Sequence, residues 1–146
     1  MIKLKRIEHD VRKRFPKVAE VLSKYPEVVV AYVFGSYAKG DTGPLSDVDI
    51  AYLLDQPLDE KKDYLKLDLR ISAEIAIALG TDEVDCYLLN KAPLPFQYEV
   101  ITTGKVIYCR DPSLKEQYES KVKKAYERRR HEFEVSKRDF LKAFRE

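Results

Sequence analysis

The run VVVAYVF, from Val28 to Phe34, limits the possible folds of this chain more than any other stretch. A strand with one face in water alternates apolar and polar side chains, whereas a strand covered on both faces is apolar throughout. The β-branched and aromatic side chains of this run also favour extended backbone. We therefore predict that Val28–Phe34 is an interior strand of a sheet with other elements packed on both faces.

Strand and helix patterns follow one another along the rest of the chain. Helical spacing over 7–22, with Pro16 breaking or restarting the helix, precedes the first strand. Further strands are expected over Asp47–Leu54, Glu83–Leu89 and Lys105–Tyr108. Helices are expected over Leu58–Leu79, Pro95–Thr103 and, as one helix or two in line, from Leu114 almost to the last residue. This order predicts an α+β (α/β-like) fold, with a small mixed sheet flanked by helices and a long C-terminal helix.

The helix expected over Leu58–Leu79 is amphipathic and has Gly80 as its C-cap. Its apolar stripe, which we expect to face the sheet, consists of Leu65, Leu69, Ala73, Ala76 and Leu79. A chain of 146 residues is most simply one domain. We expect a single domain over 1–146, with its core over about 25–110 and a C-terminal helical segment over 112–146.

Charge and composition exclude several classes of protein. Charged residues make up 36% of the chain but balance to a net charge of +2, which does not indicate a nucleic-acid coat or a membrane-surface protein. The N-terminal segment is too charged for a signal peptide, and no apolar run is long enough to span a membrane. We therefore expect a cytoplasmic protein in which Cys86 and Cys109, both in apolar strand-like runs, are reduced core thiols.

Two carboxylates interrupt the apolar pattern of the second expected strand. Asp47 and Asp49 stand at positions i and i+2, so their side chains project from one face of the strand, about 6 to 7 Å apart. Unpaired, the two charges would repel each other and raise each other's pKa, whereas a divalent cation keeps both ionised. Acidic oxygen ligands favour Mg²⁺ or Mn²⁺ over zinc. The pair therefore predicts a metal site, although an isolated Asp-x-Asp can also cap a turn on a solvated face.

The end of the first strand has the features of a phosphate site. Gly35 allows backbone N–H groups to come close to a ligand, and a helical turn that begins at Ser36 would direct its free amides towards a phosphate. Ser36 can add a hydroxyl donor, although it can equally be only the N-cap of that turn. Lys39 could contact the same phosphate or be a solvated surface lysine. A metal-binding strand beside an anion-binding turn predicts a nucleoside triphosphate site.

These residues resemble a known family. Gly35-Ser36, followed after ten residues by Asp47-Val48-Asp49, matches the G-S-x10-D-x-D signature of the DNA polymerase β-like nucleotidyltransferase superfamily. The surrounding text, FGSYAKGDTGPLSDVDIAYLL, resembles the minimal nucleotidyltransferase (MNT) branch. The resemblance implies the polymerase β-like fold and a third acidic residue on a later strand, for which we select Asp85. Asp82 and Glu83 lie close by and remain the alternatives.

The resemblance also implies an activity and a partner. Stand-alone MNT proteins of this size resemble the antitoxins of HEPN–MNT modules, in which AMP is transferred from ATP to a tyrosine of the HEPN ribonuclease toxin. It implies Mg²⁺ or Mn²⁺ held by Asp47, Asp49 and Asp85, all three in the catalytic set, with the nucleotide held by Gly35, Ser36 and Lys39. A hetero-oligomer with a HEPN toxin is then expected, without direct binding of nucleic acid.

Two other functions remain open from the residues alone. The protein could be a binding-only antitoxin that neutralises by contact, or an enzyme that acts on a small molecule or an RNA end. In the second case the basic residues around Arg128-Arg129-Arg130 could form an RNA platform, although such a helix can simply be solvated. Its aromatic residues, among them Tyr118, Tyr126 and Phe133, could instead form a docking face. No residue of the chain can be argued to select one base over another.

Overall fold

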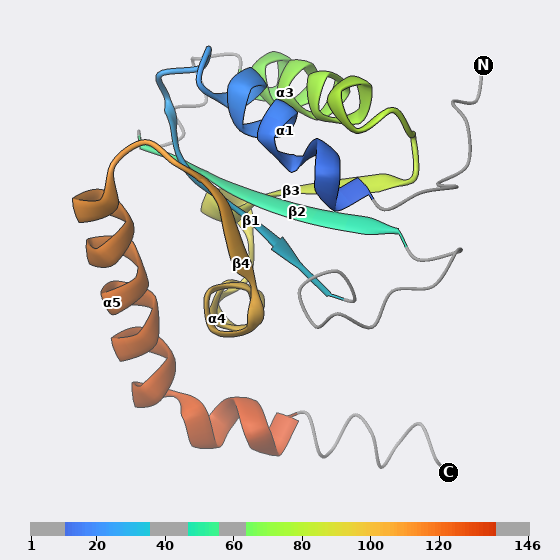
Figure 1. The fold of residues 1–146 in the computed structure, drawn as a ribbon. Coiled ribbons are helices and arrows are strands. Elements are labelled where there is room, and N and C mark those ends of the chain that lie inside the picture. The colour runs from blue at the N-terminus through green and yellow to red at the C-terminus, as the bar shows by residue number, and fades with distance from the viewer. Residues whose placement is uncertain (1–10, 36–46, 56–63, 137–146) are drawn as a thin grey trace, which may run out of the picture.

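A four-stranded mixed sheet is the centre of the fold (Figure 1). The computed structural model describes residues 11–35, 47–55 and 64–136. The strand order is β3-β2-β1-β4, and β1 pairs antiparallel with both β2 and β4, whereas β2 and β3 are parallel. The strands are β1 (Val28–Phe34), β2 (Val48–Leu54), β3 (Val84–Leu88) and β4 (Lys105–Cys109). The predicted first strand is therefore confirmed as an interior strand.

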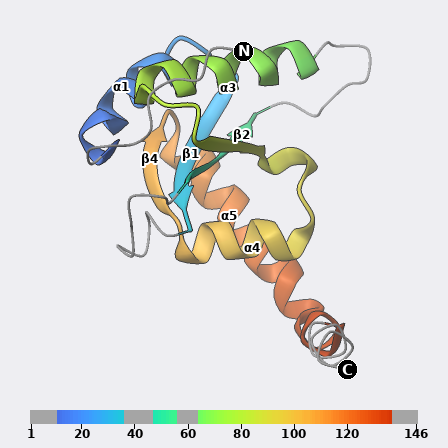
Figure 2. The ribbon, with the colours of Figure 1, turned by 90° about the vertical axis from the view of Figure 1, so that its right-hand side faces the viewer.

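Helices cover both faces of this sheet. They are α1 (Phe15–Leu22), α3 (Tyr64–Leu79), α4 (Leu94–Thr103) and α5 (Pro112–Arg128), with short 3-10 turns at Val11–Arg14 and Leu89–Lys91. Figures 1 and 2 show α1 and α3 together on one face, and α4 with α5 on the opposite face. Pro16 lies in the first turn of α1, where its missing N–H would have no partner within the helix. Proline therefore begins this helix and does not break it.

Each face of the sheet has its own apolar core. Under α1 and α3, the side chains of Ile71, Ile75 and Leu79 are fully buried against the sheet. Under α4 and α5, the core includes Tyr32, Leu89 and Val100, which are also almost fully buried. Consecutive residues of β1 alternate between these cores along most of the strand, which explains why its sequence is apolar throughout.

The predicted apolar stripe of α3 is wrong in part. Leu65 and Leu69 are 59% and 63% exposed, and Ile77 is 72% exposed, so they lie on the outer face of the helix. The inner face is formed by Ile71, Ile75 and Leu79. Because α3 has apolar residues on two opposite sides, the 3.6-residue period does not determine which side faces the sheet. Gly80 ends the helix as predicted, with a positive φ of 72°.

The C-terminal segment is not one straight helix. After α5 the chain makes a turn at Arg129, and residues 130–136 form a second helical stretch in a new direction (Figure 1). The rings of Tyr98 from α4 and Tyr126 from α5 stack with centroids 3.8 Å apart, and Phe133 stacks on Tyr126 at 5.3 Å. These aromatic residues therefore pack the segment onto α4, and Phe140 and Phe144 lie outside the described residues.

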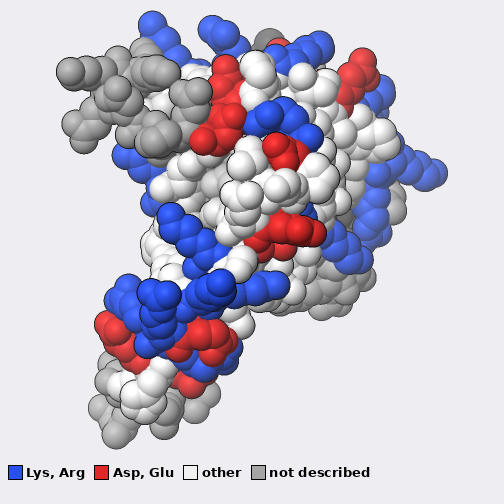
Figure 3. All heavy atoms as spheres, turned by 90° about the vertical axis from the view of Figure 1, so that its left-hand side faces the viewer, with Lys and Arg blue, Asp and Glu red and all other residues white. Residues whose placement is uncertain are grey.

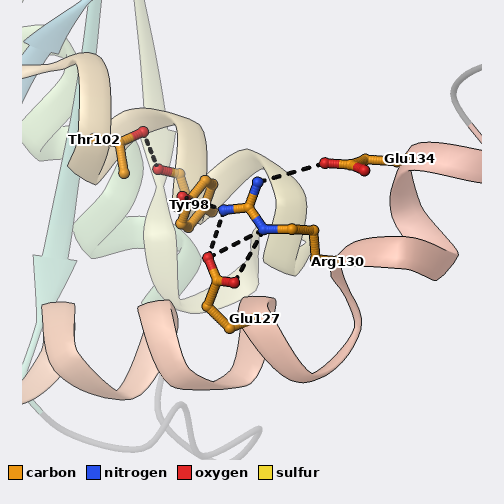
Figure 4. A network of polar contacts seen from close by, with 5 residues as sticks. All are labelled: Tyr98, Thr102, Glu127, Arg130 and Glu134. Atoms are coloured by element: carbon orange, nitrogen blue, oxygen red, sulfur yellow. Dashed lines mark hydrogen bonds and ion pairs between the residues drawn. The ribbon is translucent and has the colours of Figure 1, made fainter.

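The basic run of this segment is largely ion-paired. Figure 4 shows the Arg130 guanidinium between the carboxylates of Glu127 and Glu134, with a hydrogen bond of 3.0 Å to the hydroxyl of Tyr98. Arg129 pairs with Glu132 at 3.1 Å. In Figure 3, Lys and Arg side chains gather over this part of the surface with Asp and Glu among them. Within the described ranges, none of the helices has the length and apolar character of a membrane span.

Candidate functional site

The register of the sheet brings together acidic residues that are far apart in the sequence. Asp49 on β2 lies directly opposite Asp85 on the parallel strand β3, and opposite Phe34 on the antiparallel strand β1. Paired residues of neighbouring strands project from the same face, and neighbouring strands lie about 4.8 Å apart. Phe34 packs into the core under α4 and α5, so Asp49 and Asp85 also belong to that face. The site is therefore at the edge of the sheet where β1 ends and β2 and β3 begin.

Asp47 completes an acidic cluster at this edge. It immediately precedes β2 and is exposed, as is Asp85, whereas Asp49 is half-buried between neighbouring strands. Burial raises the pKa of Asp49 above its usual range, and the negative charges of Asp85 and Asp47 raise it further. The three carboxylates therefore interact electrostatically, and the cluster has excess negative charge that a cation would neutralise.

Gly35 follows β1 directly and lies against Asp49. Its φ of +70° is in the left-handed region, which side chains disfavour. A Cβ at this position would come within 2.7 Å of Oδ2 of Asp49, far inside van der Waals contact. The lack of a side chain at Gly35 therefore allows the chain to turn sharply while the Asp49 carboxylate occupies the adjacent space.

The donor chemistry of this edge fits a hard divalent cation. All three candidate ligands are carboxylates, which suit Mg²⁺ or Mn²⁺, and the raised pKa of Asp49 indicates that its charged form gains from a neighbouring positive charge. In the described part of the chain, no three His, Cys, Asp or Glu side chains converge closely enough to enclose a metal. The three aspartates therefore lie at one edge of the sheet, with their carboxylates set apart.

The register also distinguishes Asp85 from its two alternatives. Asp85 is the residue paired with Asp49, whereas Asp82 and Glu83 precede β3. Asp85 is also the acidic neighbour that most strongly affects the pKa of Asp49. Glu83 has a buried Oε2 atom that has no hydrogen-bond partner among the described residues. Ser36 and Lys39, the other predicted nucleotide-binding residues, lie outside the described residues.

An aromatic cluster that the sequence did not indicate lies on the same face. The ring of Tyr87 is 5.5 Å from that of Phe34 and 5.2 Å from that of Phe96, and the rings of Phe34 and Phe96 are 5.5 Å apart. Burial raises the pKa of Tyr87, and the charges of Asp85, Asp49 and Asp47 raise it further. Its one signal in the sequence is the i+2 relation of Tyr87 to Asp85, which puts both on one face of β3.

The two cysteines pack against the two opposite cores of the sheet. Cys86 packs against the core under α1 and α3, and Cys109 packs against the core under α4 and α5. Both are free thiols and half-buried, as expected of reduced cysteines. Burial raises the pKa of Cys86 to about 11, so its thiol is protonated at neutral pH and is not activated as a nucleophile.

Known proteins share this arrangement of elements. Over 83 residues the chain is 32% identical to the protein adenylyltransferase MntA of Shewanella oneidensis, and the match covers 57% of this chain and 55% of the relative. The chain thus spans about half the length of that curated relative.

Solved structures match over more of the chain. One chain of a toxin–antitoxin crystal structure with AMP-PNP is 26% identical, with a TM-score of 0.69, over 87% of this chain and 98% of that chain. A toxin–antitoxin complex of MntA, in which two aspartates two positions apart are changed to glutamate, gives 25% identity and a TM-score of 0.70 over the same shares.

The family model described as "Polymerase beta, Nucleotidyltransferase" matches residues 16–113. This range begins in α1 and ends at the start of α5, so it includes the whole sheet and the acidic edge. The polymerase β-like fold expected from the sequence is confirmed, together with the resemblance that implied it. The chain belongs to the polymerase β-type nucleotidyltransferase family.

Proposed function

We propose that this protein is a Mg²⁺-dependent protein adenylyltransferase that transfers AMP from ATP to a tyrosine of a HEPN ribonuclease toxin, and so acts as an antitoxin. The observation that carries the proposal is the pairing of Asp49 with Asp85, next to the Gly35 turn and with Asp47 two residues away. A set of carboxylates beside a glycine turn suits a nucleoside triphosphate and its metal ion. ATP and a toxin acting on RNA are both found in the cytoplasm, where we place the protein.

Each residue of the cluster has a role in this reaction. Asp47, Asp49 and Asp85 would hold Mg²⁺ or Mn²⁺, which when bound neutralises phosphate charge and polarises the attacking oxygen. The lack of a side chain at Gly35 leaves room for the Asp49 carboxylate, and Gly35, Ser36 and Lys39 follow one another in sequence as the proposed phosphate contacts. The exposed position of Asp85 at the start of β3 leaves it accessible to an incoming acceptor.

The bond changes follow from the chemistry of nucleotidyl transfer. The acceptor tyrosine oxygen forms a bond to the α-phosphorus of ATP, and the bond from that phosphorus to the oxygen bridging to the β-phosphate breaks. Pyrophosphate leaves with the electron pair, and the tyrosine proton passes to Asp85 and then to solvent. The products are a tyrosine–AMP phosphodiester, pyrophosphate and one proton. The protein mainly positions the reactants and neutralises their charge.

The similar proteins support this acceptor over the alternatives. MntA of Shewanella oneidensis is a protein adenylyltransferase, and the solved structures similar to this chain are toxin–antitoxin complexes, one of them with AMP-PNP. In another, aspartates with the spacing of Asp47 and Asp49 are the positions changed to glutamate. The ion pairs of Arg129 and Arg130 with glutamates leave less free positive charge for an RNA platform on this helix.

The proposal is tested by incubating the purified full chain with Mg²⁺, α-labelled ATP and a HEPN ribonuclease toxin. We expect label on a tyrosine of the HEPN protein, loss of its ribonuclease activity, and neither effect with the Asp47→Asn variant. A tight complex without label, with the ribonuclease inhibited, would support the binding-only antitoxin. Neither label nor complex, with label on RNA or a small molecule instead, would support the third function.

A further inference from the structure

The aromatic cluster of Phe34, Tyr87 and Phe96 combines exposure with a position beside the acidic edge. Phe34 and Phe96 are half-buried and pack on the core under α4 and α5, which explains them structurally. Tyr87 differs, because it is 36% exposed although it stands in the sheet, on the edge strand β3. Its ring is therefore supported by two other rings and still open to solvent.

The cluster is continuous with the acidic residues. Phe34 is paired with Asp49 across β1 and β2, and Tyr87 follows Asp85 by two residues on the same face of β3. Along β3, the distance between Asp85 and Tyr87 is about 6 to 7 Å, close to the length of one tyrosine side chain.

We propose that Tyr87, supported by Phe34 and Phe96, binds the aromatic ring of the acceptor tyrosine and directs its hydroxyl towards Asp85. This inference rests on the proposed function and names the subsite for its acceptor. Aromatic rings pack on one another in offset or edge-to-face geometry, each pair contributing about 0.5 to 1.5 kcal/mol beyond area burial. A phenol ring held here has its oxygen beside the carboxylate that takes the proton, which is the orientation the transfer requires.

Position favours the acceptor over the nucleotide base as the occupant. The triphosphate is expected at the Gly35 turn, which ends β1, whereas Tyr87 is on β3, on the far side of β2. Asp85, the residue assigned to the acceptor's proton, is on the same strand as Tyr87. A ring bound on Tyr87 therefore lies beside Asp85, as the proposal requires of the acceptor tyrosine.

The test compares Tyr87→Leu and Tyr87→Phe in steady-state transfer to the HEPN protein. With Tyr87→Leu we expect the KM for the acceptor to rise between about 3-fold and 10-fold with the KM for ATP unchanged, because one ring contact is lost. With Tyr87→Phe we expect nearly wild-type kinetics, because the ring is kept. Tyr64→Leu is the matched control, since Tyr64 begins α3, at the opposite end of the sheet, and packs under Lys91.

Three kinetic results would overturn the proposal. A rise in the KM for ATP alone with Tyr87→Leu would assign the cluster to the nucleotide base. Loss of transfer with Tyr87→Phe would mean that the hydroxyl acts and the ring does not. Unchanged kinetics with Tyr87→Leu in a protein that melts like wild type would mean that the cluster is only packing, and Phe96→Leu serves if Tyr87→Leu fails to fold.

A second measurement separates this proposal from the proposed function. Saturation-transfer NMR on the full chain with Mg²⁺ and AMP-PNP uses N-acetyltyrosinamide as the probe and N-acetylleucinamide as its control. We expect transfer to the phenol ring in wild type and its loss with Tyr87→Leu. If this holds while the wild type labels no HEPN protein, the proposed acceptor protein is wrong and the aromatic subsite stands. Label on the HEPN protein without ring contact at Tyr87 overturns the subsite alone.

Discussion

The two faces of the sheet are built from the same strands but differ in chemistry. Each core combines aliphatic side chains with a buried tyrosine whose hydroxyl bonds a carboxylate. Under α1 and α3 this is Tyr52, which bonds Asp68. Under α4 and α5 it is Tyr32, which bonds Glu119 at 2.7 Å. At one edge of this second face the apolar core is replaced by the acidic cluster and its aromatic neighbours.

β2 shows how one strand serves both faces. Val48 and Ile50 are fully buried in the core under α1 and α3, whereas Asp49, between them, faces the other side. Because side chains alternate along the strand, Val48 and Ile50 stabilise the core while Asp49, between them, belongs to the candidate site. The comparison implies that changes on one face should affect folding with little effect on the reaction, and that changes at the acidic edge should do the reverse.

The largest expected effect is on the reaction. Asp49→Asn should lower the rate of nucleotidyl transfer by about 10³-fold, because a metal ion at developing charge contributes several kcal/mol. Its melting temperature should be equal to or above that of wild type, since burial and two acidic neighbours already disfavour the Asp49 charge. Transfer assays and thermal melts of the same preparations check both parts. Asp82→Asn, an exposed aspartate outside the pairing, is the control and should be active.

The second effect is on folding and uses two isoleucines of the same helix. Ile75→Ala should lower the free energy of unfolding by about 2 to 5 kcal/mol, because Ile75 is 0% exposed and its removal leaves a cavity. Ile77→Ala should change it by less than about 0.5 kcal/mol, because Ile77 is 72% exposed. Urea unfolding of both variants measures the difference. Equal losses would contradict the assignment of the inner and outer faces of α3.

The third prediction concerns Gly35, where one substitution should affect both folding and the reaction. Gly35→Ala should lower the free energy of unfolding by about 1 to 3 kcal/mol, because it places a Cβ at a positive φ. It should also reduce transfer, since that Cβ would displace the Asp49 carboxylate. Unfolding curves and transfer rates measured below the melting temperature separate the two losses. If Gly35→Ala is less stable but transfers at the wild-type rate, the observed position of the Asp49 carboxylate is not required for the reaction.

Residues that are close in the sequence made the acidic pair and the central strand predictable. A run such as Val28–Phe34 has one structural interpretation, since apolar residues at consecutive positions require cover on both sides. The i, i+2 spacing of Asp47 and Asp49 likewise predicts that they lie close together at the start of an extended strand, and β2 begins between them at Val48. The choice of Asp85 over Asp82 and Glu83 could not be made from the sequence. It depends on the parallel register of β2 and β3, which pairs Asp85 with Asp49.

Features that depend on distant contacts were not predictable. Phe34, Tyr87 and Phe96 come from β1, β3 and α4, and only the strand order and the crossing of α4 bring their rings together. The inner face of α3 was ambiguous for a different reason, because Leu69 and Ile75 lie on opposite sides of a helix that is apolar on both. In each case local pattern was insufficient and tertiary packing decided the outcome.

The smallest expected effect tests the α1 and α3 face through pH. The Tyr25 hydroxyl bonds the Glu74 carboxylate of α3, and burial, followed by this bond and charge, raises the pKa of Tyr25 to about 12. A tyrosine whose pKa is higher in the folded state contributes stability that is complete below its ordinary pKa of 10.0 and is lost as pH rises towards 12. Tyr25→Phe should therefore lose about 1 kcal/mol near neutral pH, the contribution of one hydrogen bond.

The same variant should lose less further stability than wild type between pH 10 and 12, the window set by the pKa of Tyr25. Tyr32 and Tyr52 are also raised in pKa by burial, so the variant keeps part of the alkaline decrease. Urea unfolding at several pH values gives the slope for each protein. Glu74→Gln keeps a hydrogen-bond acceptor without the charge, so it should fall between wild type and Tyr25→Phe. An alkaline slope in Tyr25→Phe identical to that of wild type would show that this bond does not link α3 to the chain before β1 in solution.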